Sequence, residues 1–485
     1  MKYEPVIGLE IHAELATETK MFCSCRVVDT TQAAPNTTVC PVCAGMPGTL
    51  PVVNRKAVEY GIRVALALEC QVQHTSIFAR KNYFYPDLPK GYQISQYEDP
   101  LAVNGRLVVD TPNGEHTIRV RRVHLEEDTG KLTHVHENNA DYSLVDLNRA
   151  GVPLLEIVSE PDMHSIEDVR GYATSLRAIV RALGVNSGDM EKGVIRFEAN
   201  ISLRPAGSQE LGTRVEIKNL NSFRAMERAI LFEIHRQTKL LDAGAAVEQE
   251  TLGWDEPNQQ TYSQRSKEEA HDYRYFPEPD LPPLVVEEDW VRRIRETLPE
   301  LPRARVMRFC QVYGLTPVEA TLLVNDGEAA DYFETTAAHL KDVPARVVFA
   351  WLTGEIFAWM NQNSVPLVQV RVPPTRLAEL INAIQSGTIN QNTGKSVLAQ
   401  MLQSGQPADE IIQSQGLVQV SDADLIASLV RQVLAEHPAE LESYRAGKLT
   451  LANWFFGQVM RVAGGKANPA VLREELERQL NQTHF

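Results

Sequence analysis

The spacing of apolar residues changes once along this 485-residue chain, near residue 290. Before that point, short segments alternate apolar and polar residues, a pattern typical of strands with one buried face. After Trp290 the apolar residues recur every three or four positions, as they do in amphipathic helices. The proline-dense stretch 276–283 separates the two patterns, because proline continues neither a helix nor a central strand. The sequence therefore predicts an α+β protein.

A chain of this length is expected to form about three domains, since a domain typically has roughly 150 residues. Changes in local composition suggest where their limits lie. We expect a cradle domain built on an antiparallel sheet at 1–293, an all-helical domain at 294–404 and a small helical tail domain at 405–485. No apolar run approaches the ~20 residues that a membrane helix needs. The N-terminus also lacks the apolar stretch of a signal peptide. We therefore expect a cytoplasmic protein with no membrane partner.

The charge balance restricts the possible nucleic-acid partners. The chain has 48 basic and 63 acidic residues, a formal net charge of −15. Such a protein does not coat nucleic acid through general phosphate attraction. Any nucleic-acid partner must be bound by a local basic patch, and no DNA partner is expected.

Four of the six cysteines fall within 21 positions, in the pattern C-x-C, fourteen residues, C-x-x-C. They are Cys23, Cys25, Cys40 and Cys43. In a cytosolic chain such a cluster indicates a metal site before a disulfide. Four thiolates suit tetrahedral zinc, so the sequence predicts a zinc knuckle over 23–43. The alternative is a surface loop with four reduced thiols.

Three predicted strands, 6–14, 194–204 and 214–218, each carry polar residues along one face. Side by side they would form a broad charged floor that could hold a substrate. The alternative for any one strand is a polar face that simply meets water. The residues of this face are Glu10, His12 and Glu14, then Arg196, Glu198, Asn200, Ser202 and Arg204, and finally Arg214, Glu216 and Lys218.

Other carboxylates point to a cation. The run 124–128, His-Leu-Glu-Glu-Asp, places three acids beside an imidazole, and adjacent carboxylates persist best where a cation offsets their repulsion. Oxygen ligands suit Mg²⁺. Glu156 lies within the apolar run 154–158, and glutamate is rarely buried without a partner. It is therefore a candidate functional residue, the alternative being a buried salt bridge to a residue such as Arg149.

The segment 80–87 mixes cations with aromatic residues, among them Lys81 and Tyr83. Lysine and arginine bind phosphates, and a base can stack on an aromatic ring. Equally, Phe84 and Tyr85 could be core anchors beside a turn.

With these residues in view, the chain closely resembles the B-subunit family of the glutamyl/aspartyl-tRNA amidotransferases. The resemblance spans most of residues 1–284, and GKLTLANWFFGQVM in the tail resembles the YqeY-like C-terminal module of the family. The matching stretches are VIGLEIHAEL, KMFCSC with CPVC, GTLPVVN, RKNYFYPDLPKGYQISQY, HLEEDTGK, SLVDLNRAGVPLLEIVSEPD, EANISLRP, EIKNLNSF and DYRYFPEPDLPPL.

The resemblance implies an activity. Family members use ATP to phosphorylate the side-chain carboxylate of glutamate mischarged onto tRNA(Gln), or of aspartate on tRNA(Asn). Ammonia released from glutamine by an amidase partner then displaces the phosphate. The resemblance thus implies ATP and Mg²⁺ as cofactors, and a heterotrimer with an amidase (the A subunit) and a small third protein (the C subunit). It also implies a bacterial cytoplasm or its organellar equivalent, but not which tRNA is the physiological substrate.

The resemblance also suggests site residues. It places Mg²⁺ at His12, Glu127 and Glu156 with Glu10 alongside, and Glu126 is the alternative to Glu127 because the strand parity beyond Val123 is open. Glu198 stands where relatives often have aspartate. The remaining candidates are Lys81 and Tyr83 near nucleotide or substrate, and Glu198, Asn200 and Lys218 on the charged face.

Three other functional classes would need different sequence features. A glutaminase would need an activated cysteine or a Ser–Lys arrangement, and an aminoacyl-tRNA synthetase would carry its own ATP-binding signatures. A non-catalytic tRNA-binding scaffold within the same complex would explain the tail but not the acidic floor. The tail has ten acidic and seven basic residues. We therefore expect tRNA contact only at the cations that flank the apolar segment 449–462, namely Lys448, Arg461 and Lys466.

Overall fold

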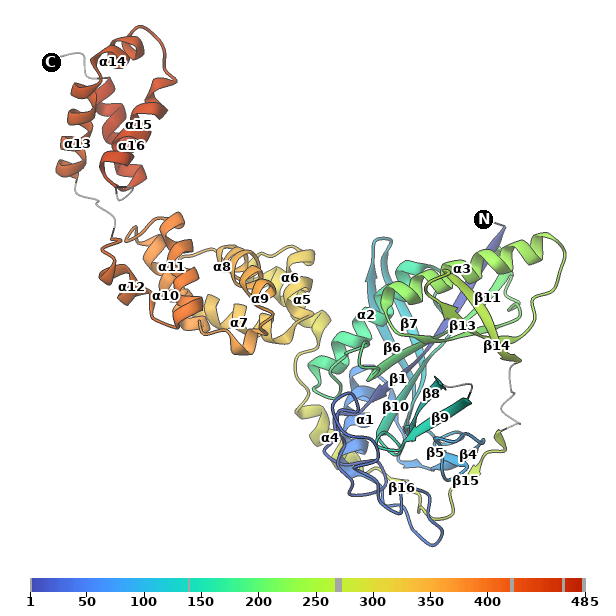
Figure 1. Cartoon of the computed structure of the whole chain (residues 1–485). Helices are drawn as coiled ribbons and strands as arrows, with labels where there is room; N and C mark the ends of the chain where they lie inside the picture. Colours follow the sequence, from blue (N-terminus) through green and yellow to red (C-terminus); the bar gives the residue numbers. More distant parts are fainter. Residues whose placement is uncertain (1, 138–139, 267–272, 419–422, 465–466, 482–485) are drawn as a thin grey trace. The chain divides into compact units, whose positions relative to one another are not determined.

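The computed structural model describes residues 2–137, 140–266, 273–418, 423–464 and 467–481 (Figure 1). The chain forms two compact units, Met1–Arg305 and Val306–Phe485. Lys466, one of the cations expected to contact tRNA, lies outside the described residues. The predicted α+β class is confirmed, with the sheet in the first unit and helices in the second.

A nine-stranded sheet dominates the N-terminal unit, in the order β14-β13-β12-β11-β1-β10-β7-β6-β2. Neighbouring strands are antiparallel, as predicted, except that β12 and β13 are parallel. The strands are β1 (Tyr3–Glu14), β2 (Gln71–Val72), β6 (Ala102–Thr111), β7 (Gly114–Glu127), β10 (Pro153–Ser159), β11 (Ile195–Pro205), β12 (Val215–Leu220), β13 (Glu250–Asp255) and β14 (Gln260–Ser266).

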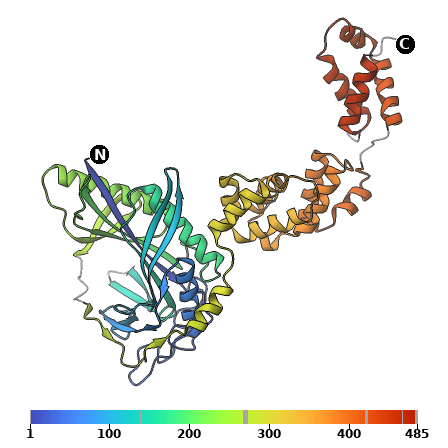
Figure 2. The ribbon, with the colours of Figure 1, turned by 180° about the vertical axis from the view of Figure 1, so that it is seen from behind.

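Helices cover the apolar face of this sheet (Figures 1 and 2). They are α1 (Arg55–Ala67), α2 (Ile166–Ala182) and α3 (Phe223–Asp242), while α4 (Glu288–Glu296) packs against α1. Ile11, Leu125, Leu155 and Phe197 are fully buried beneath them. Because side chains alternate along a strand, the residues next to these four lie on the opposite face.

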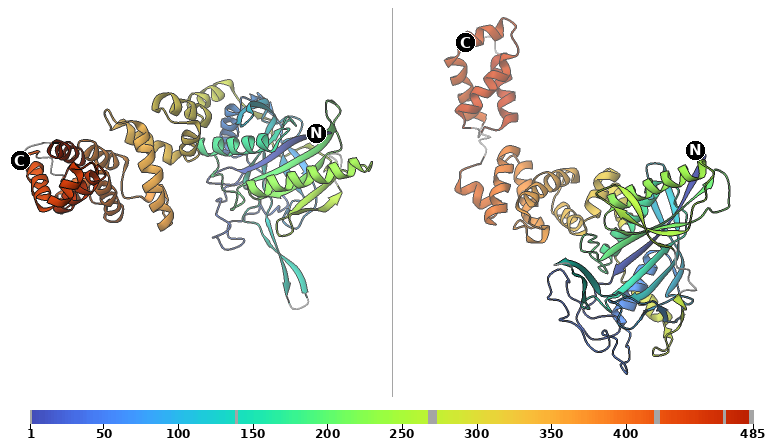
Figure 3. Two further views of the ribbon diagram at one scale, coloured as in Figure 1. Left: turned by 90° about the horizontal axis from the view of Figure 1, so that it is seen from above. Right: turned by 45° about the vertical axis from the view of Figure 1, so that its right-hand side comes forward.

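Smaller sheets lie next to the main sheet (Figure 1). One contains β15 (Phe276–Pro277), β4 (Ala79–Asn82) and β5 (Tyr92–Ser95), and another pairs β16 (Leu284–Val285) with β3 (Thr75–Ser76). A hairpin of β8 (Lys131–Glu137) and β9 (Ala140–Asp146) extends from the unit in the left panel of Figure 3. The four cysteines lie in the long connection between β1 and α1.

The C-terminal unit is built from helices around two separate cores. The apolar run 347–360 is divided among α8, a π-helix (Leu352–Ile356) and α9. The helices are α5 (Pro302–Tyr313), which begins in the first unit, α6 (Pro317–Val324), α7 (Gly327–Ala338), α8 (Ala345–Trp351), α9 (Phe357–Asn363), α10 (Pro374–Gln385), α11 (Gln391–Ser404), α12 (Ala408–Ser414), α13 (Ala423–Glu436), α14 (Pro438–Arg445), α15 (Leu451–Val462) and α16 (Pro469–Leu480). Among the described residues, no helix combines the length and the hydropathy needed to cross a membrane.

The three hydrophobic cores can be compared with the expected domain limits at residues 293 and 404, which stay predictions. Ile294 belongs to the first core, just past residue 293. Ile411 and Ile412 of α12 belong to the second core, past residue 404, and the third core begins at Ile426. Phe455 is fully buried in the third core, so this aromatic residue of the tail has a structural role.

Close packing of α1 against the strands that carry the site gives a stability prediction. A Cβ at Gly61 would lie 2.7 Å from Leu101 Cδ2 and 3.2 Å from Leu125 Cδ2. Gly61→Val should therefore lower the free energy of unfolding by about 1–3 kcal/mol through overpacking. Thermal melting measures this, with Gly457→Ala in α15 as the control because its Cβ meets open space. Equal melting temperatures for Gly61→Val and wild type would contradict the packing.

Candidate functional site

The strand register aligns three side chains across the centre of the sheet. β1 lies between β10 and β11, and His12 faces Glu156 on one side and Arg196 on the other. On β7, His124 lies opposite Glu156. His12, Glu156 and His124 therefore form a row on the charged face, and the alternation predicted for β1 placed His12 correctly.

His12, Glu126 and Glu156 form a group that could hold a metal ion. Each offers one ligand atom, and these atoms lie within 4.8 Å of one another. His12 Nε2 is 3.2 Å from Glu156 Oε2 and 3.6 Å from Glu126 Oε1. Ser95 Oγ donates to the other oxygen of Glu126 at 3.2 Å. Glu126 and Glu156 are only 2% and 6% exposed, so both carboxylates need a positive partner.

Glu127 is not part of this group. Its carboxylate pairs with Lys90, and the backbone N–H of Ile94 donates to Glu127 Oε1 at 3.0 Å. The expected set of His12, Glu127 and Glu156 is therefore not the set that the structure brings together. β7 continues without interruption to Glu127, so the alternation that directs His124 to the charged face directs Glu126 there as well.

Glu156 does form a buried salt bridge, but its partner is Arg122 and not Arg149. Arg149 Nε lies 3.7 Å from Asp128 Oδ2 instead. Glu156 is contacted by His12, by His124 Nε2 at 3.4 Å and by Arg122 Nη2 at 3.9 Å. All three neighbours lie on the charged face, so Glu156 belongs to the candidate site.

A second acidic group adjoins the first. Ligand atoms of Glu10, Glu198 and Glu216 lie within 4.8 Å of one another. Lys218 Nζ donates to Glu198 Oε2 at 2.7 Å, and Asn200 Nδ2 donates to Glu10 Oε1 at 2.8 Å. The candidates that the polar-face pattern predicted on β11 and β12 therefore meet in space.

A cavity lies over the second group and over His12 and Glu156 of the first, and residues from β4, β5 and the segment that precedes β15 close it. Lys81 enters it from β4, with Nζ 5.0 Å from the centroid of the Tyr273 ring. Tyr83 is not among the lining residues; its hydroxyl donates to Gln93 Oε1 at 3.0 Å. The lining residues are Glu10, His12, Lys81, Ser95, Tyr97, Arg122, His124, Glu156, Glu198, Arg214, Glu216, Lys218, Thr251, Tyr273 and Tyr275.

Several lining residues were not predicted from the sequence. Arg122 and His124 lie on the face of β7 that also carries Glu126, so tracing the alternation along this strand would have found them. The Tyr97 and Tyr275 rings stack with centroids 4.2 Å apart, and the Arg122 guanidinium lies 5.7 Å from the centroid of Tyr97. This aromatic pair joins positions far apart in the chain, and no local pattern indicates it.

The buried acids shift the ionisation of their neighbours in the cavity. Burial opposes protonation of His12, but the hydrogen bond and charge of Glu156 outweigh it and raise the pKa to about 9. Burial, together with the charges of Glu156 and Glu198, raises the pKa of Glu10. For Lys81, burial is outweighed by neighbouring groups, Tyr275 and Glu126 first, and the pKa is raised well above its usual value. The cavity thus combines densely packed acids with a lysine that stays charged.

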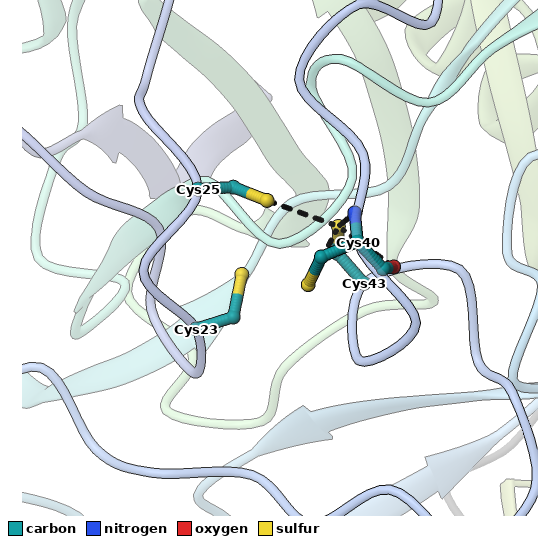
Figure 4. Close-up of side chains that lie close together, drawn as sticks. All are labelled: Cys23, Cys25, Cys40 and Cys43. Carbon is teal, nitrogen blue, oxygen red and sulfur yellow. Dashed lines mark hydrogen bonds between the residues drawn. The ribbon is translucent and has the colours of Figure 1, made fainter.

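The four cysteines of the predicted zinc knuckle come together at a second site (Figure 4). Their sulfur atoms all lie within 4.8 Å of one another, and Cys43 Sγ is 3.8 Å from Cys40 Sγ and 4.0 Å from Cys25 Sγ. A tetrahedron with Zn–S bonds of about 2.3 Å has S–S edges of about 3.8 Å. The Cys40 N–H also donates to Cys43 Sγ at 3.2 Å. The donor set and its spacing fit a zinc ion.

Comparisons with known proteins agree with this layout. Residues 5–292 match the family model described as "GatB/GatE catalytic domain", and residues 331–480 match "GatB domain". A relative from Myxococcus xanthus is 48% identical over 99% of this chain and 98% of its own length. Relatives from Moorella thermoacetica and Thermomicrobium roseum are each 49% identical over 99% of this chain, covering 100% and 99% of those proteins. All three are named as the B subunit of the aspartyl/glutamyl-tRNA(Asn/Gln) amidotransferase. The chain therefore belongs to the B-subunit family of the aspartyl/glutamyl-tRNA(Asn/Gln) amidotransferases.

Proposed function

We propose that this chain is the ATP-dependent ligase component that amidates glutamate on mischarged tRNA(Gln), or aspartate on tRNA(Asn). The observation that carries the proposal is the group His12, Glu126 and Glu156, of which His12 and Glu156 line a cavity that Lys81 and Arg122 also line. The relatives' names support it, because they state an amidotransferase that acts on aspartyl- and glutamyl-tRNA. A purely tRNA-binding scaffold would not need these buried acids.

The chemistry requires activation of a carboxylate. Ammonia does not displace the oxygen of a free carboxylate, whereas an acyl phosphate has a good leaving group. Transfer of the γ-phosphoryl group of ATP to a carboxylate oxygen of the substrate gives an acyl phosphate and ADP. Ammonia then attacks the carbonyl carbon, loses a proton and expels phosphate, leaving the amide. No protein nucleophile takes part, and catalysis rests on positioning and charge neutralisation.

The residues of the cavity suit these tasks. His12, Glu126 and Glu156 would hold Mg²⁺, which when bound neutralises charge on phosphate oxygens. Lys81 and Arg122 present positive charge beside this group, where phosphate or the substrate carboxylate would lie. Glu10, Glu198 and Lys218 form the adjoining wall that orients the substrate, and Asn200 holds Glu10 through its hydrogen bond. We assign Tyr83 a supporting place, because its ring packs edge-on against Tyr273 at 6.0 Å between centroids.

The remaining assignments concern partners and the second metal. We infer that an amidase, the A subunit, supplies ammonia and that a heterotrimer is completed by a small C subunit, since each relative is named as one part of a larger enzyme. The reaction belongs to protein biosynthesis in the cytoplasm. The four cysteines bind structural zinc, and the tail domain contacts tRNA through Lys448 and Arg461 at the ends of its apolar segment.

Removing cysteines should remove the zinc. We expect about one equivalent of tightly bound zinc in the purified protein, because four closely spaced thiolates bind it strongly. The double substitution Cys40→Ser with Cys43→Ser should abolish zinc binding and lower the melting temperature, while Cys310→Ser, outside the cluster, should change neither. Metal analysis and thiol titration test this. Freshly purified protein without zinc and with four freely titratable thiols would disprove the site.

Glu126 and Glu127 should differ in their effect on amidation. Glu126→Gln should reduce ATP-dependent amidation by about 10³-fold or more, as expected when a metal ligand of phosphoryl transfer is lost. Glu127→Gln removes the partner of Lys90 and should mainly lower the melting temperature. Amidation of mischarged tRNA by the complex, with ammonium replacing glutamine, separates the two. Full activity in Glu126→Gln would mean that the metal lies elsewhere.

Removing the tail should change the KM for mischarged tRNA but not the KM for ATP. Because α12 packs into the second core, the tail is best removed by deleting residues 419–485. The truncated protein should have a higher KM for mischarged tRNA and an unchanged KM for ATP. The double variant Lys448→Ala with Arg461→Ala should shift the tRNA KM in the same direction without truncation. Equal tRNA affinity with and without the tail, at one salt concentration, would argue against this role.

A further inference from the structure

Lys20 is a fully buried cation beside the four-cysteine site. Its side chain is 0% exposed. The ammonium group donates to Thr38 O at 2.9 Å and to Leu147 O at 3.1 Å, and it lies 3.6 Å from Cys43 Sγ. Across the described residues, no carboxylate oxygen lies within 4.0 Å of Lys20 Nζ. The lysine is thus buried without the acidic partner that such a residue usually has.

Burying an ammonium group is unfavourable unless an opposite charge is near. The two carbonyl groups supply dipoles but no net charge. Cys43 is the contact that can carry a negative charge, and it does so as a thiolate. Four thiolates around one divalent metal ion have a net charge of −2, and Cys43, the buried member of the cluster, is the ligand that meets Lys20. The positive charge of Lys20 and the negative charge of the centre therefore offset each other.

We propose that Lys20 is the counter-charge of the four-cysteine zinc centre and that it strengthens metal binding. This inference rests on the proposed zinc site. Lys20 is a positioning residue and not a ligand: it acts through Cys43, whose sulfur also accepts the N–H of Cys40. Its two carbonyl contacts fix the ammonium group, because they come from separate segments, at Thr38 and at Leu147.

Measuring zinc affinity tests whether the positive charge of Lys20 strengthens metal binding. Wild type, Lys20→Met and Lys20→Arg are compared in the full-length protein by competition for zinc with a chromophoric chelator at one pH. Lys20→Met keeps the apolar stem and loses the charge, and it should bind zinc about tenfold more weakly or worse, the loss typical of a partner behind a metal ligand. Lys20→Arg should stay much closer to wild type. Lys192→Met, on a half-exposed lysine paired with Asp29, is the matched control and should not change zinc affinity.

A second measurement distinguishes the charge effect from simple hydrogen bonding to the carbonyls. In wild type, Lys20→Met should lower the melting temperature. In the zinc-free variant with Cys40→Ser and Cys43→Ser, the same change should lower it less, or raise it, because the negative charge is gone. Lys20→Gln serves in both backgrounds if Lys20→Met does not fold. An equal loss of melting temperature in both backgrounds would overturn the proposal.

The outcomes separate this inference from the zinc site itself. If wild type contains no zinc, the zinc assignment fails and the inference fails with it. If wild type contains zinc and Lys20→Met binds it as tightly, the zinc site stands and the role of Lys20 is refuted.

Discussion

Repulsion between buried carboxylates is the constraint on which the N-terminal unit depends. Glu126, Glu156, Glu198 and Glu216 are all at least largely buried on one face of the sheet. Each is held by a donor from a neighbouring strand or from the small sheet above it, such as His12 for Glu156 and Lys218 for Glu198. With the proposed function, a substrate phosphate would add further negative charge to this face. The site combines acids that could hold a metal ion with permanently charged side chains.

The opposite face of the same strands makes this arrangement possible. Ile11, Leu125, Leu155 and Phe197 anchor the strands to the helices through contacts that involve no charge. Their burial fixes the register, since a slip of one residue would exchange the two faces. The positions of His12, Glu126 and Glu156 are thus set by apolar neighbours one residue away. Stability and chemistry are divided between the two sides of a single sheet.

Much of this could be read from local pattern, and the exceptions have physical causes. Alternation in β1, β11 and β12 predicted the charged floor, and Glu156 stood out as an acid in an apolar run. The structure groups Glu126, and not the preferred Glu127, with His12 and Glu156. The sequence could not make this choice because it does not place the end of β7, and one residue reverses the face. The pairing of Tyr97 with Tyr275 joins two connections whose positions only the folded sheet determines. The hydrogen bond of Tyr83 to Gln93 also joins segments whose positions the local pattern does not give.

The contacts of Lys20 connect parts of the chain that are synthesised at different times. All four cysteines and Thr38 lie within the first 43 residues, whereas Leu147 follows 127 residues after Lys20. A nascent chain can therefore bring the four cysteines of the proposed zinc site together before β10 has been translated, while the ammonium group still has an open hydrogen-bonding position. When Leu147 arrives, its carbonyl completes the shell and secures the turn that leads into β10 and Glu156. An early, local contact thus precedes the docking of a strand that carries part of the candidate cavity.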